Sequence, residues 1–424
     1  MNQYNALAKS LLLVLMLWAY SHSTSYALDC PDTTWQAKIE KNGGKIMLDY
    51  SSASSYGVVS PGASIYKVLY WDTKTGESRL YQYNKKTNRF ELAPAIEQLP
   101  AQPLANSSGK GEIMIDFEYH HDGVDFQELI LVWNTATGAS NIYRRYKLSS
   151  DEPSPFVLKK DNRLPSQPLG QAPKGKIMMD LEASTRGGYL TLVWDTKSTS
   201  YQLYDKDGIP HRKDQLPKSP RKTRPDLLKP AYNKGPISAD YVMFYNRQQR
   251  HMKERIIFWD KQTGASCLYA YAGGNKDRFL PYAGKTQLPL NPLRLSEQAL
   301  ANPNNDIRMK MIIAHHDETS TSRAKMNSEI LVWNATTGRS MVYRYNSYNK
   351  TYRGINTLLP RNPLGKAPKG KIMIEYVPTC GSKKTEYEFL VWDTATGESK
   401  YYYYSAKEKR YKSAGVGLPA APLK

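Results

Sequence analysis

The residues best suited to chemistry in this sequence are two copies of a His-His-Asp triplet. They are His120-His121-Asp122 and His315-His316-Asp317. Imidazole and carboxylate groups are common ligands of transition metals, and a histidine that titrates near neutral pH can also transfer protons. Adjacent residues of an extended strand point to opposite sides, so each triplet offers one imidazole to a common site. Metal binding or catalysis, contact with a ligand, and a structural role all remain open for these residues.

A second set of candidates consists of carboxylates at the ends of short apolar stretches of similar sequence. The four members are Asp49, Asp116, Asp180 and Glu375. A ring of carboxylates could hold a hard cation such as Ca²⁺, which takes several oxygen ligands. Alternatively, each carboxylate accepts backbone N–H bonds from a neighbouring unit and sets the spacing between units. The sequence thus allows a Ca²⁺ or transition-metal ion, and we expect no other cofactor.

Both sets recur because the chain is built from repeated units. Each unit contains an apolar stretch that ends in Trp-Asp or Trp-Asn, and successive Trp lie about 60 residues apart. These residues are Trp71, Trp133, Trp194, Trp259, Trp333 and Trp392. The units cover approximately residues 43–104, 105–169, 170–220, 221–293, 294–364 and 365–424. We expect the six Trp to be structural, because a bulky side chain at a fixed strand position packs between sheets.

The residues that follow each Trp predict a hairpin turn. Asp or Asn accepts backbone N–H bonds there, and a glycine supplies the positive φ that closes the turn. The glycines are Gly76, Gly138, Gly264, Gly338 and Gly397, whereas Thr199 takes this place in the third unit and predicts a different turn. Each unit ends in Leu-Pro-x-x-Pro, and proline ends a sheet because it cannot donate to the strand ladder. The one candidate helix spans residues 295–301.

Four short antiparallel strands in each of six units predict an all-β fold, a six-bladed β-propeller with four strands per blade. The Trp-Asp-x-x-Thr-Gly hairpin, as in residues 391–397, resembles the hairpin that ends WD40 repeats, over about a dozen residues per unit. The Gly-His pair of that family is absent from every unit, so the resemblance implies the propeller architecture and no WD40 function. In such a ring the second and fifth units, and with them the two His-His-Asp triplets, lie opposite each other.

The first 27 residues predict a secretory signal peptide. Lys9 precedes the apolar stretch 11–18, and Ser25-Tyr26-Ala27 places small residues where a signal peptidase cleaves. Residues 28–424 are then expected to form one secreted or periplasmic propeller, monomeric and without a transmembrane segment. Cys30 and Cys380 are candidates for a disulfide that closes the ring, and Cys267 for a buried free thiol.

The formal net charge of +20 favours an anionic partner. An exported protein is an improbable partner of nucleic acid, and a solvated basic surface that aids solubility is the alternative. We expect a binding protein that recognises a glycan, an anionic envelope polymer or a partner protein through loops that vary among the units on one face. The competing hypothesis is a hydrolase or lyase acting on polysaccharide, with the histidines and carboxylates at the mouth of the central channel in catalytic roles.

Overall fold

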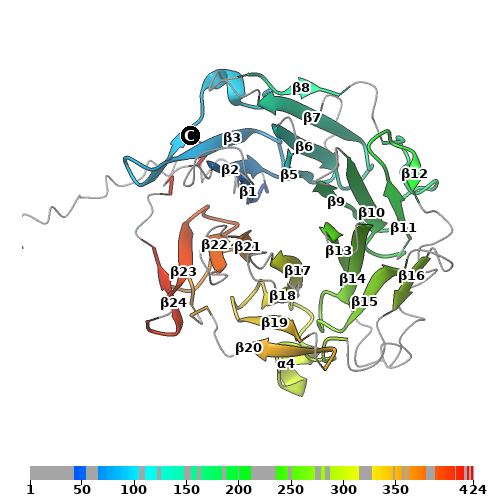
Figure 1. The fold of residues 1–424 in the computed structure, drawn as a ribbon, viewed down its shortest axis with the longest axis vertical. Helices are drawn as coiled ribbons and strands as arrows, with labels where there is room; N and C mark the ends of the chain where they lie inside the picture. The colour runs from blue at the N-terminus through cyan, green and yellow to red at the C-terminus, as the bar shows by residue number, and fades with distance from the viewer. Residues whose placement is uncertain are drawn as a thin grey trace, which may run out of the picture.

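Six four-stranded antiparallel sheets surround a common axis in the computed structural model of the protein (Figure 1). The structure describes residues 43–53, 65–104, 110–121, 126–147, 154–159, 164–183, 188–198, 200–211, 235–246, 251–272, 278–281, 287–314, 327–346, 349–355, 359–360, 362–378, 387–405, 407–414, 418–419 and 422–423. Each sheet is built from four strands that are consecutive in the chain. The all-β, six-bladed propeller predicted from the repeats is therefore confirmed.

The four strands of each blade follow one another from the axis to the outer edge (Figure 1). The innermost strands are β1 (Ile46–Ala53), β5 (Ile113–His121), β9 (Ile177–Ala183), β13 (Ile237–Asn246), β17 (Ile307–Ala314) and β21 (Ile372–Pro378). The second strands are β2 (Ile65–Asp72), β6 (Phe126–Asn134), β10 (Tyr189–Asp195), β14 (His251–Asp260), β18 (Asn327–Asn334) and β22 (Tyr387–Asp393). The third strands are β3 (Ser78–Asn84), β7 (Ser140–Lys147), β11 (Tyr201–Tyr204), β15 (Ser266–Ala272), β19 (Ser340–Asn346) and β23 (Ser399–Ser405). The outer strands are β4 (Arg89–Leu92), β8 (Val157–Leu158), β12 (Pro210–His211), β16 (Arg278–Pro281), β20 (Thr351–Ile355) and β24 (Arg410–Ser413).

The turn after each Trp has the predicted backbone geometry. The five glycines at its end have φ between 67° and 76°. In the third blade, Asp195 accepts the N–H groups of Lys197 and Ser198 within the turn, at 2.7 and 2.9 Å. Its other oxygen accepts from Lys174 and Gly175, which precede the innermost strand. The acidic residue thus closes the hairpin and also fixes the start of its own blade, while Thr199 lies outside the described residues.

The innermost strand of every blade is tied to the preceding blade by the same backbone bond. Its first residue is isoleucine in all six blades, and its N–H donates to the carbonyl of the residue after Trp-Asp or Trp-Asn of the preceding blade, at 2.5–2.9 Å. Ile46 donates to Thr394 in this way at 2.8 Å, which joins the first blade to the last. The ring therefore closes by repeating an ordinary interblade contact.

The Trp residues pack in these same interfaces, as predicted. All six are at most 4% exposed. In four blades the indole N–H donates to the carbonyl of the isoleucine that begins the next blade, for example Trp133 to Ile177 at 3.1 Å. Trp194 and Trp392, within the part of the chain that the structure describes, have buried indole nitrogens without a hydrogen-bond partner.

The Leu-Pro-x-x-Pro linkers are held by tyrosines of the next blade. Tyr143 donates its hydroxyl hydrogen to the carbonyl of Pro103 at 2.7 Å, and Tyr343 donates to Pro292 at 2.6 Å. Tyr81 of the first blade donates at 2.9 Å to Pro422, which follows the last blade. This is a second contact that closes the ring, and Tyr204 and Tyr402 donate in the same way to the carbonyls of Pro168 and Pro363.

Several other sequence predictions concern regions outside these sheets. The predicted helix at 295–301 is present as α4 (Glu297–Ala301), and a short 3₁₀ helix, η1 (Ala95–Glu97), follows β4. Cys267 is buried and, among the described residues, takes part in no disulfide, as expected. The signal peptide, Cys30 and Cys380 lie outside the described residues. Among the described helices, none is long and apolar enough to cross a membrane.

Candidate functional site

The carboxylates predicted near the axis form part of a ring with six members. Asp49, Asp116, Asp180 and Glu375 each pair in register with the residue two positions before the Trp of their blade. The same register position is taken by Asp240 in the fourth blade and by Lys310 in the fifth. The ring thus contains five carboxylates and one ammonium group.

Asp240 was missed because the fourth innermost strand begins earlier than the sequence indicated. The most apolar stretch of that unit starts at Tyr241, whereas β13 begins at Ile237. Lys310 lies within the apolar stretch of the fifth unit. It was missed because its charge is opposite to that of the carboxylates at the same position in the other units. Aligning the six units on the Trp, instead of on their apolar stretches, would have placed both residues in the ring.

Four ring carboxylates bind the backbone of the next blade. Asp116 accepts the N–H of Leu181 at 2.6 Å, and Asp180 accepts that of Tyr241 at the same distance. Asp49 accepts from Phe117 at 2.7 Å, and Asp240 accepts from Met311 at 2.5 Å. The fifth carboxylate, Glu375, lies 3.6 Å from the ammonium nitrogen of Lys310. These are the interblade contacts that the sequence offered as the alternative to a cation site.

Burial and mutual repulsion raise the pKa of every ring carboxylate. Burial is the main cause, and it raises the pKa of Asp49, Asp240 and Glu375 to about 7. Burial followed by the charge of the next carboxylate in the ring raises the pKa of Asp116 to about 6 and that of Asp180 to about 8. Near neutral pH the ring therefore holds protons that free carboxylates would have lost.

Lys310 acts on the whole ring. Burial alone would lower its pKa, but Glu375 and the ring aspartates raise it well above its ordinary value. Its positive charge in turn opposes the rise of the pKa at all five ring carboxylates. Lys310 is thus a built-in counter-ion for a ring that would otherwise contain only acids.

Two further carboxylates extend the acidic region toward the ends of the innermost strands. Glu118 and Glu182 lie two residues beyond Asp116 and Asp180, on the same side of their strands. Burial, followed by the charge of a neighbouring carboxylate, raises the pKa of both well above its ordinary value. Glu182 also accepts the N–H of Met243 in the next blade, at 3.2 Å.

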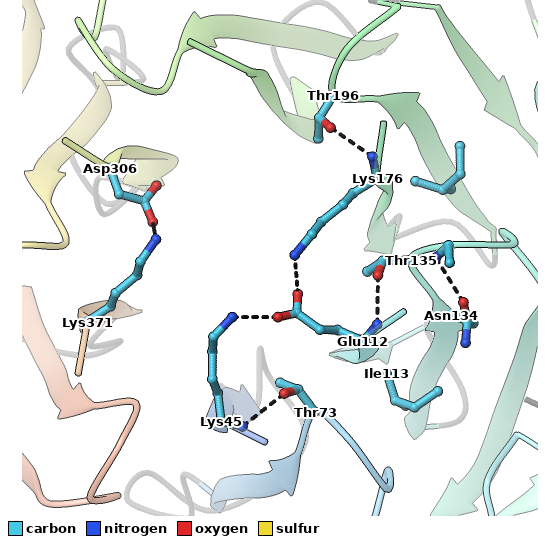
Figure 2. Close-up of polar contacts among 12 residues, drawn as sticks. Lys45, Thr73, Glu112, Ile113, Asn134, Thr135, Lys176, Thr196, Asp306 and Lys371 are labelled. Carbon is cyan, nitrogen blue, oxygen red and sulfur yellow. Dashed lines mark hydrogen bonds and ion pairs between the residues drawn. The ribbon is translucent and has the colours of Figure 1, made fainter. Parts of the chain in front are cut away.

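A different charged cluster lies at the other end of the innermost strands, beside the Trp turns. We call it the basic cluster; it consists of Lys45, Glu112, Lys176, Lys261, Asp306, Arg308 and Lys371. Glu112 bridges Lys45 and Lys176 at 2.5 and 2.7 Å (Figure 2). These three residues come from three successive blades, and each directly precedes the isoleucine that begins the innermost strand.

The second half of the basic cluster is centred on Asp306 of the fifth blade. Its carboxylate lies 2.5 Å from the ammonium nitrogen of Lys371 (Figure 2). It also lies 3.0 Å from the ammonium nitrogen of Lys261 and 3.0 Å from the guanidinium of Arg308. Burial would raise the pKa of Asp306, but Arg308, Lys261 and Lys371 hold it well below its ordinary value. Burial and the charge of Arg308 lower the pKa of Lys261 to about 7.

Sequence reasoning missed the basic cluster because it treated the Trp-turn face as uniform. The position before the isoleucine is Lys45, Glu112, Lys176, Pro236, Asp306 and Lys371 in the six units. Its variation within an otherwise regular repeat was the available signal. In the fourth blade proline occupies this position, and Lys261 of the Trp turn supplies the charge instead.

The structure leaves the predicted histidine site largely undescribed. The backbone of His120 and His121 ends β5, paired with Gln127 and Phe126. Their side chains, Asp122 and the triplet 315–317 lie outside the described residues. Among the residues that are described, no group of three or more His, Cys, Asp or Glu is placed to hold a metal ion.

Comparison with known proteins finds structural likeness only. No protein-family model and no curated protein sequence matches the chain. A fucose-specific lectin from Aleuria aurantia shares 9% identity at a TM-score of 0.48, over 88% of this chain and 97% of the lectin. A GH74 xyloglucanase from Xanthomonas campestris and fructan 1-exohydrolase IIa from Cichorium intybus each share 10% identity, at TM-scores of 0.36 and 0.35. The alignments cover 82% of this chain and 43% of the xyloglucanase, and 70% and 57% for the exohydrolase. Likeness at this level favours neither binding nor catalysis.

Proposed function

We propose that this protein is an exported binding protein for an anionic glycan or envelope polymer, which it holds through the varied loops of the face opposite the Trp turns. The ring gives these loops a rigid base, and recognition needs no covalent chemistry. The proposal rests on one observation, the unequal burial of acids and bases.

Acidic side chains are buried far more often than basic ones. Eleven Asp and Glu residues are buried in the described part of the chain, against two basic residues, Lys67 and Arg145. Both of these bases are ion-paired with Glu97 and Glu128. Because the whole chain has a formal charge of +20, the remaining residues carry a positive excess larger than the composition alone suggests. Such a surface attracts polyanions and repels polycations.

The ring carboxylates fit a structural role better than the competing catalytic one. A general acid or base must reach a substrate proton, whereas four of these carboxylates accept backbone N–H bonds between blades. Removing one would therefore disturb blade spacing before it altered any reaction. Of the residues singled out in the sequence, the enzyme hypothesis then depends on the two His-His-Asp triplets and Glu375.

A glycan array that carries sulfated, uronic-acid and neutral members tests the proposal directly. We expect the mature protein to bind the acidic members and to release them as salt rises from about 0.05 to about 0.5 M, because screening weakens contacts between exposed charges. Equal binding of neutral glycans, or binding that salt leaves unchanged, would contradict the proposal.

The same preparation distinguishes the alternatives. Metal analysis and a His121→Ala/His316→Ala double variant test whether the triplets hold an ion or a ligand. Bound metal that is lost in the variant, together with release of reducing ends from a polysaccharide, would indicate the enzyme. A stable complex with a second protein, recovered by crosslinking, would indicate an assembly role.

A further inference from the structure

The basic cluster has more positive than negative charge. Glu112 is shared by two lysines, and Asp306 is shared by two lysines and an arginine. Five basic groups therefore surround two carboxylates. Even when Lys261, whose pKa is about 7, is counted as neutral, two positive charges remain in excess of the carboxylates. A buried or half-buried excess of this kind is stabilised by an anion from outside.

Three lysines are the most accessible part of the cluster. The side chains of Lys45, Lys176 and Lys371 are 44%, 56% and 44% exposed, whereas those of the carboxylates Glu112 and Asp306 are 27% and 4% exposed. Figure 2 shows Lys371 with Asp306, apart from Lys45 and Lys176, which meet at Glu112. A molecule that approaches this end of the axis meets ammonium groups from several blades before it meets a carboxylate.

We infer that the basic cluster is a second binding site, on the face opposite the proposed glycan site, for an anion that carries several phosphate groups. Four of its five cations are lysines, which bind phosphate as compact point charges. A ligand with several charges is required because the cations form two separate groups, one around Glu112 and one around Asp306. This inference does not depend on the proposed function.

The acidic ring limits how far such an anion can enter. Asp49, Asp116 and Asp180 lie three or four residues further along the strands that begin beside the cluster. Any of these carboxylates that is ionised repels a phosphate, so the ligand stays at the end of the axis. The two charged regions together therefore define a shallow site.

Calorimetric titration of the mature protein with sodium tripolyphosphate tests the inference. We expect measurable binding to tripolyphosphate and at least tenfold weaker binding to inorganic phosphate, which cannot span both halves of the cluster. A Lys45→Gln/Lys371→Gln double variant should lose at least tenfold in affinity, with an unchanged melting temperature. Equal affinity of the variant and the unmodified protein would overturn the inference.

Two further variants separate a specific site from general charge attraction. Lys85→Gln/Lys86→Gln removes the same charge from the exposed turn between β3 and β4, and should leave the affinity within twofold. Glu112→Gln leaves Lys45 and Lys176 without their carboxylate, and should tighten binding several-fold. Equal weakening in both lysine pairs would assign binding to net charge, and weaker binding by Glu112→Gln would likewise contradict the site.

Discussion

Replacing Asp180 by asparagine should stabilise the protein at alkaline pH and leave its stability at acidic pH almost unchanged. Asp180 lies in the acidic ring, where burial and the charge of Asp240 raise its pKa to about 8. Its Oδ2 accepts the N–H of Tyr241 at 2.6 Å. The amide oxygen of asparagine can accept the same bond, so the substitution removes a charge and keeps the contact.

The sign and size of the effect follow from proton binding. Between about pH 4 and pH 8 folded Asp180 holds a proton that the unfolded chain has lost, so the free energy of unfolding falls as pH rises. The interval from an ordinary pKa of 3.8 to about 8 corresponds to at most about 6 kcal/mol at 1.36 kcal/mol per pKa unit. Because the ring members titrate together, we expect about 2 kcal/mol of this to be recovered in the Asp180→Asn variant at about pH 9.

Urea denaturation at intervals from about pH 4 to about pH 9 measures the effect as a shift of the midpoint. The variant and the unmodified protein should coincide near pH 4, separate progressively between about pH 4 and about pH 8, and keep a constant difference above that. A variant that is destabilised equally at every pH would refute the reasoning, because it would mean that the ring is fully ionised by Lys310 and that the lost charge was favourable.

Asp195→Asn, in the same blade, is the matched control of opposite sign. Burial would raise the pKa of Asp195, but four backbone N–H bonds lower it below its ordinary value. Its contribution to stability is therefore present above about pH 4 and is lost as pH falls through the folded-state pKa. The control should destabilise the protein at neutral pH by about 1–3 kcal/mol, with a smaller effect near pH 3.

Three further predictions concern contacts between blades and within one blade. Trp133→Phe should cost about 1 kcal/mol more than Trp194→Phe by urea denaturation, because only Trp133 donates to a carbonyl, that of Ile177; equal costs would contradict a role for the indole bond. Gly370→Ala would place its new methyl 2.5 Å from the backbone nitrogen of residue 395 and should lower the midpoint by about 2 kcal/mol, whereas Gly188→Ala meets no atom within 4 Å and should change it by under about 0.5 kcal/mol. Glu128→Gln should cost about 3 kcal/mol, because it leaves Lys67 and Arg145 buried with less negative charge; a neutral effect would show that Glu97 alone suffices.

Local features of the chain were readable from the sequence because they depend on near neighbours. The turn glycines are an example: a hairpin closed by five residues needs positive φ at its end, and Gly76 and Gly397 have φ of 74° and 67°. The burial of Trp71 and a helix at 295–301, observed at 297–301, were predicted for similar reasons. The repetition of such features six times was sufficient to indicate a closed ring of small sheets.

The composition of the axial region was decided by tertiary structure. Asp240 and Lys310 join the ring because the register of β13 and β17 pairs them with Ile257 and Leu331, two positions before the Trp of each blade. An apolar stretch does not specify that register. The basic cluster exists because residues more than 60 apart in the chain, such as Lys45 and Glu112, begin adjacent innermost strands. The sequence by itself determined the blades and their turns, through contacts within each unit. Which charges meet at the axis was settled only when six units closed into a ring, because electrostatic interactions act between groups that are close in space, whatever their separation in the chain.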